Sequence, residues 1–222
     1  MPLILYIDTA SEMAIVGLGT EDGVLASEMN TDQMNHASFV QPAIQRVLAV
    51  TSVDIEQIDA VAVVNGPGSY TGLRVGLASA KGICYTLHKP LIALNTLAIM
   101  ASAAIQSFND SFALYCPLID ARRNEVFTAI YNSALDVVLP PQPKIIEPDS
   151  FNIYLDEQRV LFFGSGHNKC GKSISHKNAV FKDVHYTTNH ISVLAAKAYM
   201  NTQFADIAYS EPFYTKDFFS TG

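Results

Sequence analysis

Two segments of this chain, more than 100 residues apart, share one plan. Residues 5–18 read LYIDTASEMAIVGL and residues 117–131 read PLIDARRNEVFTAIY. Each starts as an apolar strand ending in Ile-Asp, passes through a short polar turn and enters a second apolar strand. The plan places Asp8 opposite Asp120 and predicts a duplicated domain, although two unrelated hairpins would give the same pattern.

The remaining elements predict an α/β fold. Apolar runs predict strands over residues 3–7, 14–18, 24–29, 58–64, 91–94 and 160–163. Apolar residues at helical spacing predict helices over residues 38–48, 73–87, 96–105 and 192–200. Ser38 and Gln41 fit a capping box for the first helix, with Pro42 in or near its first turn. The polar residues 109–111 are the expected joint, so the predicted domains are 1–108 and 109–222, with a tail that can return to the first.

Composition restricts the function. The net charge of −7 argues against a protein that binds nucleic acid alone, because phosphate binding relies on Lys and Arg; a partner could still supply a basic surface. The three cysteines form no C-x-x-C pair, so neither a disulfide framework nor a zinc knuckle is expected. The N-terminus does not resemble a signal peptide, and no apolar run approaches the roughly 20 residues of a membrane span. We therefore expect a cytoplasmic protein without membrane contact.

The segment NGPGSYTGLR, residues 65–74, joins a predicted strand to a predicted helix. Gly66, Pro67 and Gly68 suit a type II turn, and Thr71 can cap the helix. Strand, glycine loop and helix can also hold a phosphate, but Arg74 is the only nearby cation. We expect the loop to shape the start of the helix.

A second glycine motif, GHNKCGKS at residues 166–173, matches the phosphate-binding pattern G-x-x-x-x-G-K-[ST]. The following residues have no apolar helical stripe, and no later strand ends in a metal-binding Asp. We interpret this match as coincidence. The six histidines include no H-E-x-x-H and no pair at i, i+4, and there is no G-x-S-x-G elbow. No catalytic or metal-binding residue is assigned.

The predicted helix 73–87 is apolar on nearly all faces, so it must be buried on both sides. Its small residues at i, i+4 would allow a second helix to approach closely, and helix 38–48 is the expected neighbour. We interpret the pair as a protein–protein interface, with a helix internal to the monomer as the alternative. The predicted interface residues are Phe39, Ala43, Val47, Gly72, Leu73, Gly76, Ala80 and Ile83.

Four segments together resemble the TsaB, or YeaZ-like, family. They are LYIDTASEMAIVGL, NGPGSYTGLRVGLASAKGI, LIDARRNEVFTAIY and the tail EPFYTK, in this order and spacing. The resemblance implies two related actin/Hsp70-like (RNase H-like) domains with mixed sheets flanked by helices. It also implies a non-catalytic subunit that dimerises with its paralogue, the transferase TsaD, to make N6-threonylcarbamoyladenosine at position 37 of tRNA. The ATPase TsaE is then expected to join, and the chain alone to form a homodimer.

The same resemblance implies that catalysis belongs to the paralogue. The metal-binding H-x-x-x-H of TsaD corresponds here to Thr96 and Met100, which cannot form that site. The turns after Asp8 and Asp120 lack the glycines of actin-like nucleotide loops, so ATP or ADP is expected only in the assembled complex. Lys216 stands where the family more often has Arg. An actin-like ATPase or small-molecule kinase remains the alternative, and a peptidase is disfavoured.

Overall fold

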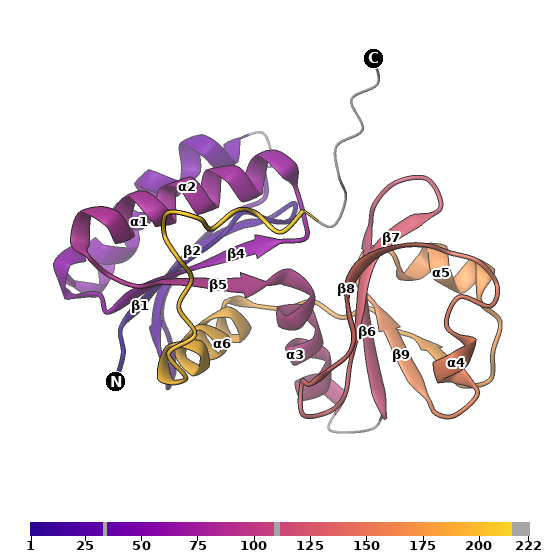
Figure 1. Ribbon diagram of the computed structural model, residues 1–222. Helices are drawn as coiled ribbons and strands as arrows, with labels where there is room; N and C mark the ends of the chain where they lie inside the picture. Colours follow the sequence, from indigo (N-terminus) through magenta and orange to yellow (C-terminus); the bar gives the residue numbers. More distant parts are fainter. Residues whose placement is uncertain (33–34, 109–111, 215–222) are drawn as a thin grey trace, which may run out of the picture. The chain divides into compact units, whose positions relative to one another are not determined.

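The computed structural model describes residues 1–32, 35–108 and 112–214 (Figure 1). The chain forms two compact units. The first unit contains residues 1–96 and 187–213, and the second contains residues 97–186 with Tyr214. The boundary therefore differs from the predicted one between residues 108 and 109, because the helix after residue 96 belongs to the second unit. The segment that returns to the first unit, residues 187–213, includes a helix and is therefore longer than the predicted tail.

The first unit is built on a five-stranded sheet of order β3-β2-β1-β4-β5. β1 pairs antiparallel with β2, and β2 with β3, whereas β1, β4 and β5 are parallel. The strands are β1 (Ile4–Asp8), β2 (Ala14–Thr20), β3 (Gly23–Asn30), β4 (Ala60–Gly66) and β5 (Leu91–Asn95). All five residues of β1 are buried, as expected for a strand with helices on both faces.

The second unit repeats this topology in a sheet of order β10-β9-β6-β7-β8. β6, β7 and β8 are antiparallel neighbours, and β6, β9 and β10 are parallel. The strands are β6 (Leu114–Asp120), β7 (Glu125–Tyr131), β8 (Val137–Ile145), β9 (Val160–Phe163) and β10 (Ala179–Phe181). Asp8 and Asp120 end the central strands β1 and β6. The predicted duplication and the actin-like fold class are confirmed.

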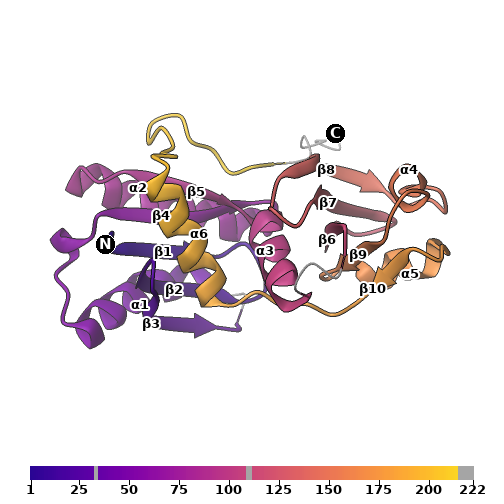
Figure 2. The same cartoon turned by 90° about the horizontal axis from the view of Figure 1, so that it is seen from below.

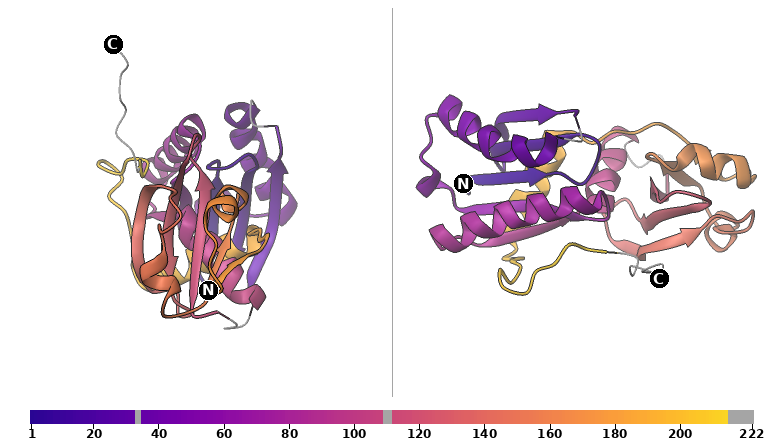
Figure 3. Two further views of the ribbon diagram at one scale, coloured as in Figure 1. Left: turned by 90° about the vertical axis from the view of Figure 1, so that its right-hand side faces the viewer. Right: turned by 90° about the horizontal axis from the view of Figure 1, so that it is seen from above.

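The helices also correspond between the two units. In the first unit, α1 (His36–Thr51) and α2 (Tyr70–Leu87) pack side by side on one face of the sheet, and a 3-10 turn (Ile55–Gln57) follows α1 (Figure 3). In the second, α4 (Asn152–Leu155) and α5 (His167–Ser173) take the equivalent positions in the chain. α1 and α2 are long and α4 and α5 short, so only the first unit presents a broad helical layer.

Two helices are exchanged between the units. α3 (Thr96–Phe108) follows the last strand of the first unit, but its apolar residues belong to a core of the second unit. Conversely, α6 (Thr188–Met200) follows β10 and packs on the strands of the first unit (Figure 2). Each sheet is therefore covered on one face by a helix that follows the last strand of the other unit.

The predicted start of the first helix is wrong. α1 begins at His36, after Asn35, so Ser38 lies inside the helix, where its hydroxyl donates to the carbonyl of Asn35. Pro42 consequently lies in the second turn and not in the first. The predicted joint at residues 109–111 lies outside the described residues.

Candidate functional site

The glycine loop between β4 and α2 packs tightly on the turn that follows Asp8. The Ser69 backbone N–H donates to the carbonyl of Ala10 at 2.7 Å, and a Cβ at Gly68 would overlap that carbonyl. The predicted type II turn is wrong, because the Gly66–Pro67 peptide is cis and the positive φ, 123°, belongs to Gly66. The loop closes onto its own unit.

The cap of α2 is Ser69 and not Thr71, which is exposed within the helix. The Gly72 N–H donates to the Ser69 hydroxyl at 3.3 Å, and the Thr9 hydroxyl donates to the Gly72 carbonyl at 2.6 Å. A Cβ at Gly72 would overlap the carbonyl oxygen of Thr9. Close backbone packing thus explains the glycine at position 72 without any bound phosphate.

The small-residue stripe of α2 faces the sheet of its own unit, so the prediction that it contacts a partner is wrong. A Cβ at Gly76 would lie 2.5 Å from the Thr9 hydroxyl and within 3.6 Å of Ile7 and Val63. The absence of a side chain at Gly76 allows α2 to lie close to β1 and β4. Six of the predicted interface residues are buried inside the monomer: Ala43, Val47, Gly72, Leu73, Gly76 and Ala80.

The outward face of α2 carries a second set of small residues. Ala78 and Gly82 are exposed one helical turn apart, and a Cβ at Gly82 would meet nothing within 4 Å. Tyr85, whose exposed fraction is 76%, continues this face. A groove of about 290 Å³ runs beside it, lined by Gln41, Ile55, Ser79, Gly82, Ile83, Thr86 and Leu87. Because Ile83 and Phe39 are only half-buried, they are the two predicted interface residues that remain available to a partner.

A C-terminal strap, residues 205–213, crosses the same unit (yellow in Figure 1). Its first residue, Ala205, donates to the carbonyl of Leu91 in β5 at 2.8 Å. Lys81 of α2 then donates to two strap carbonyls, at 3.2 and 3.0 Å. The Phe213 N–H donates to the Asn65 carbonyl beside the glycine loop at 2.7 Å. The strap therefore ties β5, α2 and the loop together; Lys216 lies outside the described residues.

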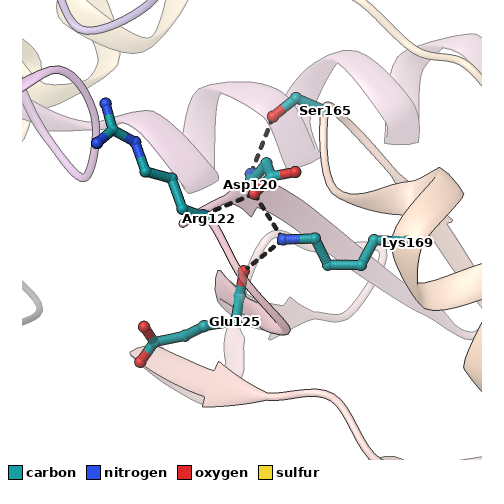
Figure 4. Close-up of polar contacts among 5 residues, drawn as sticks. All are labelled: Asp120, Arg122, Glu125, Ser165 and Lys169. Carbon is teal, nitrogen blue, oxygen red and sulfur yellow. Dashed lines mark hydrogen bonds and ion pairs between the residues drawn. The ribbon is translucent and has the colours of Figure 1, made fainter.

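In the second unit, the carboxylate of Asp120 is held by the protein itself (Figure 4). Lys169 of α5 donates to Asp120 Oδ1 at 2.6 Å and to the Glu125 carbonyl at 3.0 Å. The Arg122 N–H donates to Oδ1 at 2.7 Å, and the Asp120 N–H donates to the Ser165 hydroxyl at 3.0 Å. Partial burial works to raise the pKa of Asp120, but these hydrogen bonds and the Lys169 charge outweigh it and lower the pKa.

The segment that matches a phosphate loop is helical. Residues 167–173 form α5, with Gly166 as its N-cap, so their backbone N–H groups cannot form a loop around phosphate. Lys172 is exposed in the last turn. The match is therefore a coincidence of sequence.

The described residues offer no group of three His, Cys, Asp or Glu side chains that could hold a metal ion. Thr96 is buried, and its hydroxyl has no hydrogen-bond partner in the described part of the chain. Met100 is also buried, and its terminal methyl fills the space where a Cβ of Gly164 would lie. Burial raises the pKa of Cys84 to about 11 and that of Cys170 to about 12, so both thiols are protonated and unreactive at neutral pH.

Two matching α/β units with exchanged helices define a protein of the actin-like fold class. The solved structure of an uncharacterized Pseudomonas aeruginosa protein similar to the peptidase YeaZ has this fold, with a TM-score of 0.81 and 22% identity over 97% of this chain and 100% of that one. The family model "TsaD: tRNA N6-adenosine threonylcarbamoyltransferase" matches residues 23–213.

Sequence relatives define the family more narrowly. The Bacillus subtilis tRNA threonylcarbamoyladenosine biosynthesis protein TsaB is 32% identical over 72% of this chain and 70% of its own length. A tRNA N6-adenosine threonylcarbamoyltransferase from Symbiobacterium thermophilum is 47% identical, but only over 28% of this chain and 18% of its own length. The chain belongs to the TsaB family. No helix among the described residues is both long and apolar enough to cross a membrane.

Proposed function

We propose that this protein is the non-catalytic subunit that dimerises with a TsaD-like transferase in tRNA threonylcarbamoyladenosine biosynthesis. Membership of the TsaB family supports a role in tRNA threonylcarbamoyladenosine biosynthesis. The match of the TsaD family model to residues 23–213 supports a common fold for this protein and TsaD. Paralogues with a common fold can pair through equivalent surfaces in a pseudo-symmetric dimer.

The outward face of α2 is the observation that carries this proposal. An exposed glycine within a helix costs about 0.5 to 1 kcal/mol relative to alanine, so Gly82 weakens the isolated helix. The same glycine lets a second helix approach closely beside the groove, where Ile83 and Leu87 offer apolar contact. The partner that fits this surface is the corresponding helix pair of the paralogue. A second copy of the chain would occupy it when the paralogue is absent.

The proposed subunit binds no nucleotide or metal alone. Asp120 is already paired with Lys169, and the glycine loop is packed on Thr9 and Ala10. ATP or ADP, a TsaE-like ATPase and tRNA are therefore engaged by the complex, which would work in the cytoplasm.

Replacement of Gly82 by Arg tests the interface. The long charged side chain would enter the helix–helix contact, and burying an unpaired charge costs several kcal/mol. We expect affinity for the TsaD-like partner to fall at least about 100-fold, with a parallel loss of tRNA modification. The matched control is Gly171→Arg, because Gly171 is an exposed glycine in the equivalent helix α5. Wild-type affinity of Gly82→Arg, measured by titration calorimetry, would show that the surface lies elsewhere.

The non-catalytic part of the proposal has its own test. The purified chain is assayed for threonylcarbamoyl transfer to tRNA with and without the partner proteins. Transfer above background by this chain alone would overturn it.

A further inference from the structure

The hairpin turn between β6 and β7 holds two consecutive arginines in an unfavourable backbone conformation. Arg122 and Arg123 have φ angles of 68° and 47°, in the left-handed region that favours glycine. Each such residue costs on the order of 1 kcal/mol relative to glycine. The fold needs a turn here but not these side chains.

The turn is rigidly held. The Ala121 N–H donates to the Glu125 carbonyl at 3.1 Å, and the Glu125 N–H donates to the Arg122 carbonyl at 3.2 Å. Asn124 exchanges hydrogen bonds with Ile146, its side-chain amide donating and its carbonyl accepting. The ion pair between Asp120 and Lys169 anchors the base of the turn. The two arginines are thus presented on a fixed support.

Both guanidinium groups are available. Arg122 and Arg123 are exposed, and neither side chain forms a hydrogen bond or ion pair with any residue that the structure describes. The carboxylate of Asp120, at the base of the turn, is paired with Lys169. The Glu125 carboxylate extends in a different direction from the Arg122 guanidinium (Figure 4).

Charge is unevenly divided between the units. Residues 1–96 with 187–213 hold five Lys or Arg and eleven Asp or Glu, a net charge of −6. Residues 97–186 hold eight and nine, a net charge of −1. An anionic polymer is therefore repelled less by the second unit than by the first, and Arg122 and Arg123 are among the exposed basic residues of the second unit.

We infer that Arg122 and Arg123 contact backbone phosphates of the tRNA in the assembled complex. The guanidinium fork matches phosphate oxygens in a bidentate geometry, which favours this ligand. The inference rests on the proposed function, because that function supplies the RNA. The inference assigns an RNA contact to this subunit, although its net charge of −7 argues against RNA binding by the subunit alone.

The test measures tRNA affinity of the complex with its TsaD-like and TsaE-like partners, over a range of salt concentrations. The probe is an unmodified tRNA transcript followed by fluorescence anisotropy. The double variant Arg122→Ala/Arg123→Ala should bind about tenfold more weakly or worse. Its log–log salt slope should also shrink by about one per lost phosphate contact. The charge-matched control is Lys177→Ala/Lys197→Ala, two exposed lysines elsewhere, which should leave affinity and slope nearly unchanged.

A second variant removes folding as an explanation. Arg122→Gly/Arg123→Gly deletes both charges while relieving the backbone, so its melting temperature should not fall, but its tRNA affinity should. Wild-type affinity and slope in both double variants would overturn the inference. Weaker binding to the TsaD-like partner, with unchanged tRNA affinity once assembled, would also overturn it and identify a protein contact. A wild-type complex that neither assembles nor binds tRNA would reject the proposed function and this inference with it.

Discussion

The two units share one strand order but use the turn after their central strand differently. In the first unit, Asp8 is fully buried, its carboxylate accepts the Ala10 N–H at 2.9 Å, and the glycine loop packs over the turn. In the second unit, the Asp120 side chain is 43% exposed and paired with Lys169. A duplicated fold thus preserves the position of an aspartate while changing its surroundings. The first turn is packed under the glycine loop and the start of α2, and the second presents charge to solvent.

The largest contrast is expected between two glycines of α2. A Cβ at Gly72 would overlap the Thr9 carbonyl, and backbone cannot easily move aside, so Gly72→Ala should destabilise by about 3 kcal/mol. Gly82→Ala should instead stabilise the isolated chain by about 0.5 to 1 kcal/mol, since its Cβ meets open space. Chemical denaturation of both variants checks the opposite signs. A stabilising Gly72→Ala would mean that α2 does not approach β1 as closely as described.

The two aspartates should differ by a smaller amount. Asp8→Ala leaves the buried Ala10 N–H without its acceptor, which costs about 1 to 3 kcal/mol. Asp120→Ala breaks a partly exposed ion pair and should cost less than about 1 kcal/mol. Urea unfolding of the two variants measures both. Equal losses would show that the second turn contributes as much to stability as the first.

The smallest effect concerns pH. Burial lowers the pKa of His190, which caps α6 in the first unit by accepting the Thr187 N–H at 3.0 Å. A lowered pKa in the folded state means that this stability is complete above the ordinary histidine pKa of about 6.5 and is lost as the pH falls through the folded pKa. The pKa of Asp120 is also lowered, so its contribution is lost only below about pH 4.

Between pH 7.5 and 5.5, the loss of the His190 cap should therefore lower the thermal stability of the first unit. Wild type should lose more stability over this range than His190→Gln, because glutamine keeps the capping geometry without titrating. A variant that follows the wild-type pH dependence would assign the change to another group.

Much of the fold could be predicted from the sequence, because the Ile-Asp hairpins and apolar runs report local periodicity. The unit boundary could not, since a helix such as α3 carries no signal for which sheet it will cover. The proposed interface lies on the predicted helix but on its opposite face, because the predicted stripe is buried against the sheet. Gly72, Gly76 and Ala80 have the same spacing as Ala78 and Gly82, and only the position of the sheet distinguishes inward from outward. The Arg122–Arg123 turn was missed, because its signal is a backbone angle.

The exchange of α3 and α6 affects how the chain can be made. β1, β2 and β3 leave the ribosome early, but the helix that covers one of their faces begins at Thr188. At translation rates of about 5–20 residues per second, the interval from Thr20 to Thr188 lasts roughly ten to thirty seconds. During this time the nascent sheet has an uncovered apolar face. The first unit therefore completes its folding only after the second has been synthesised, and it is exposed to chaperones until then.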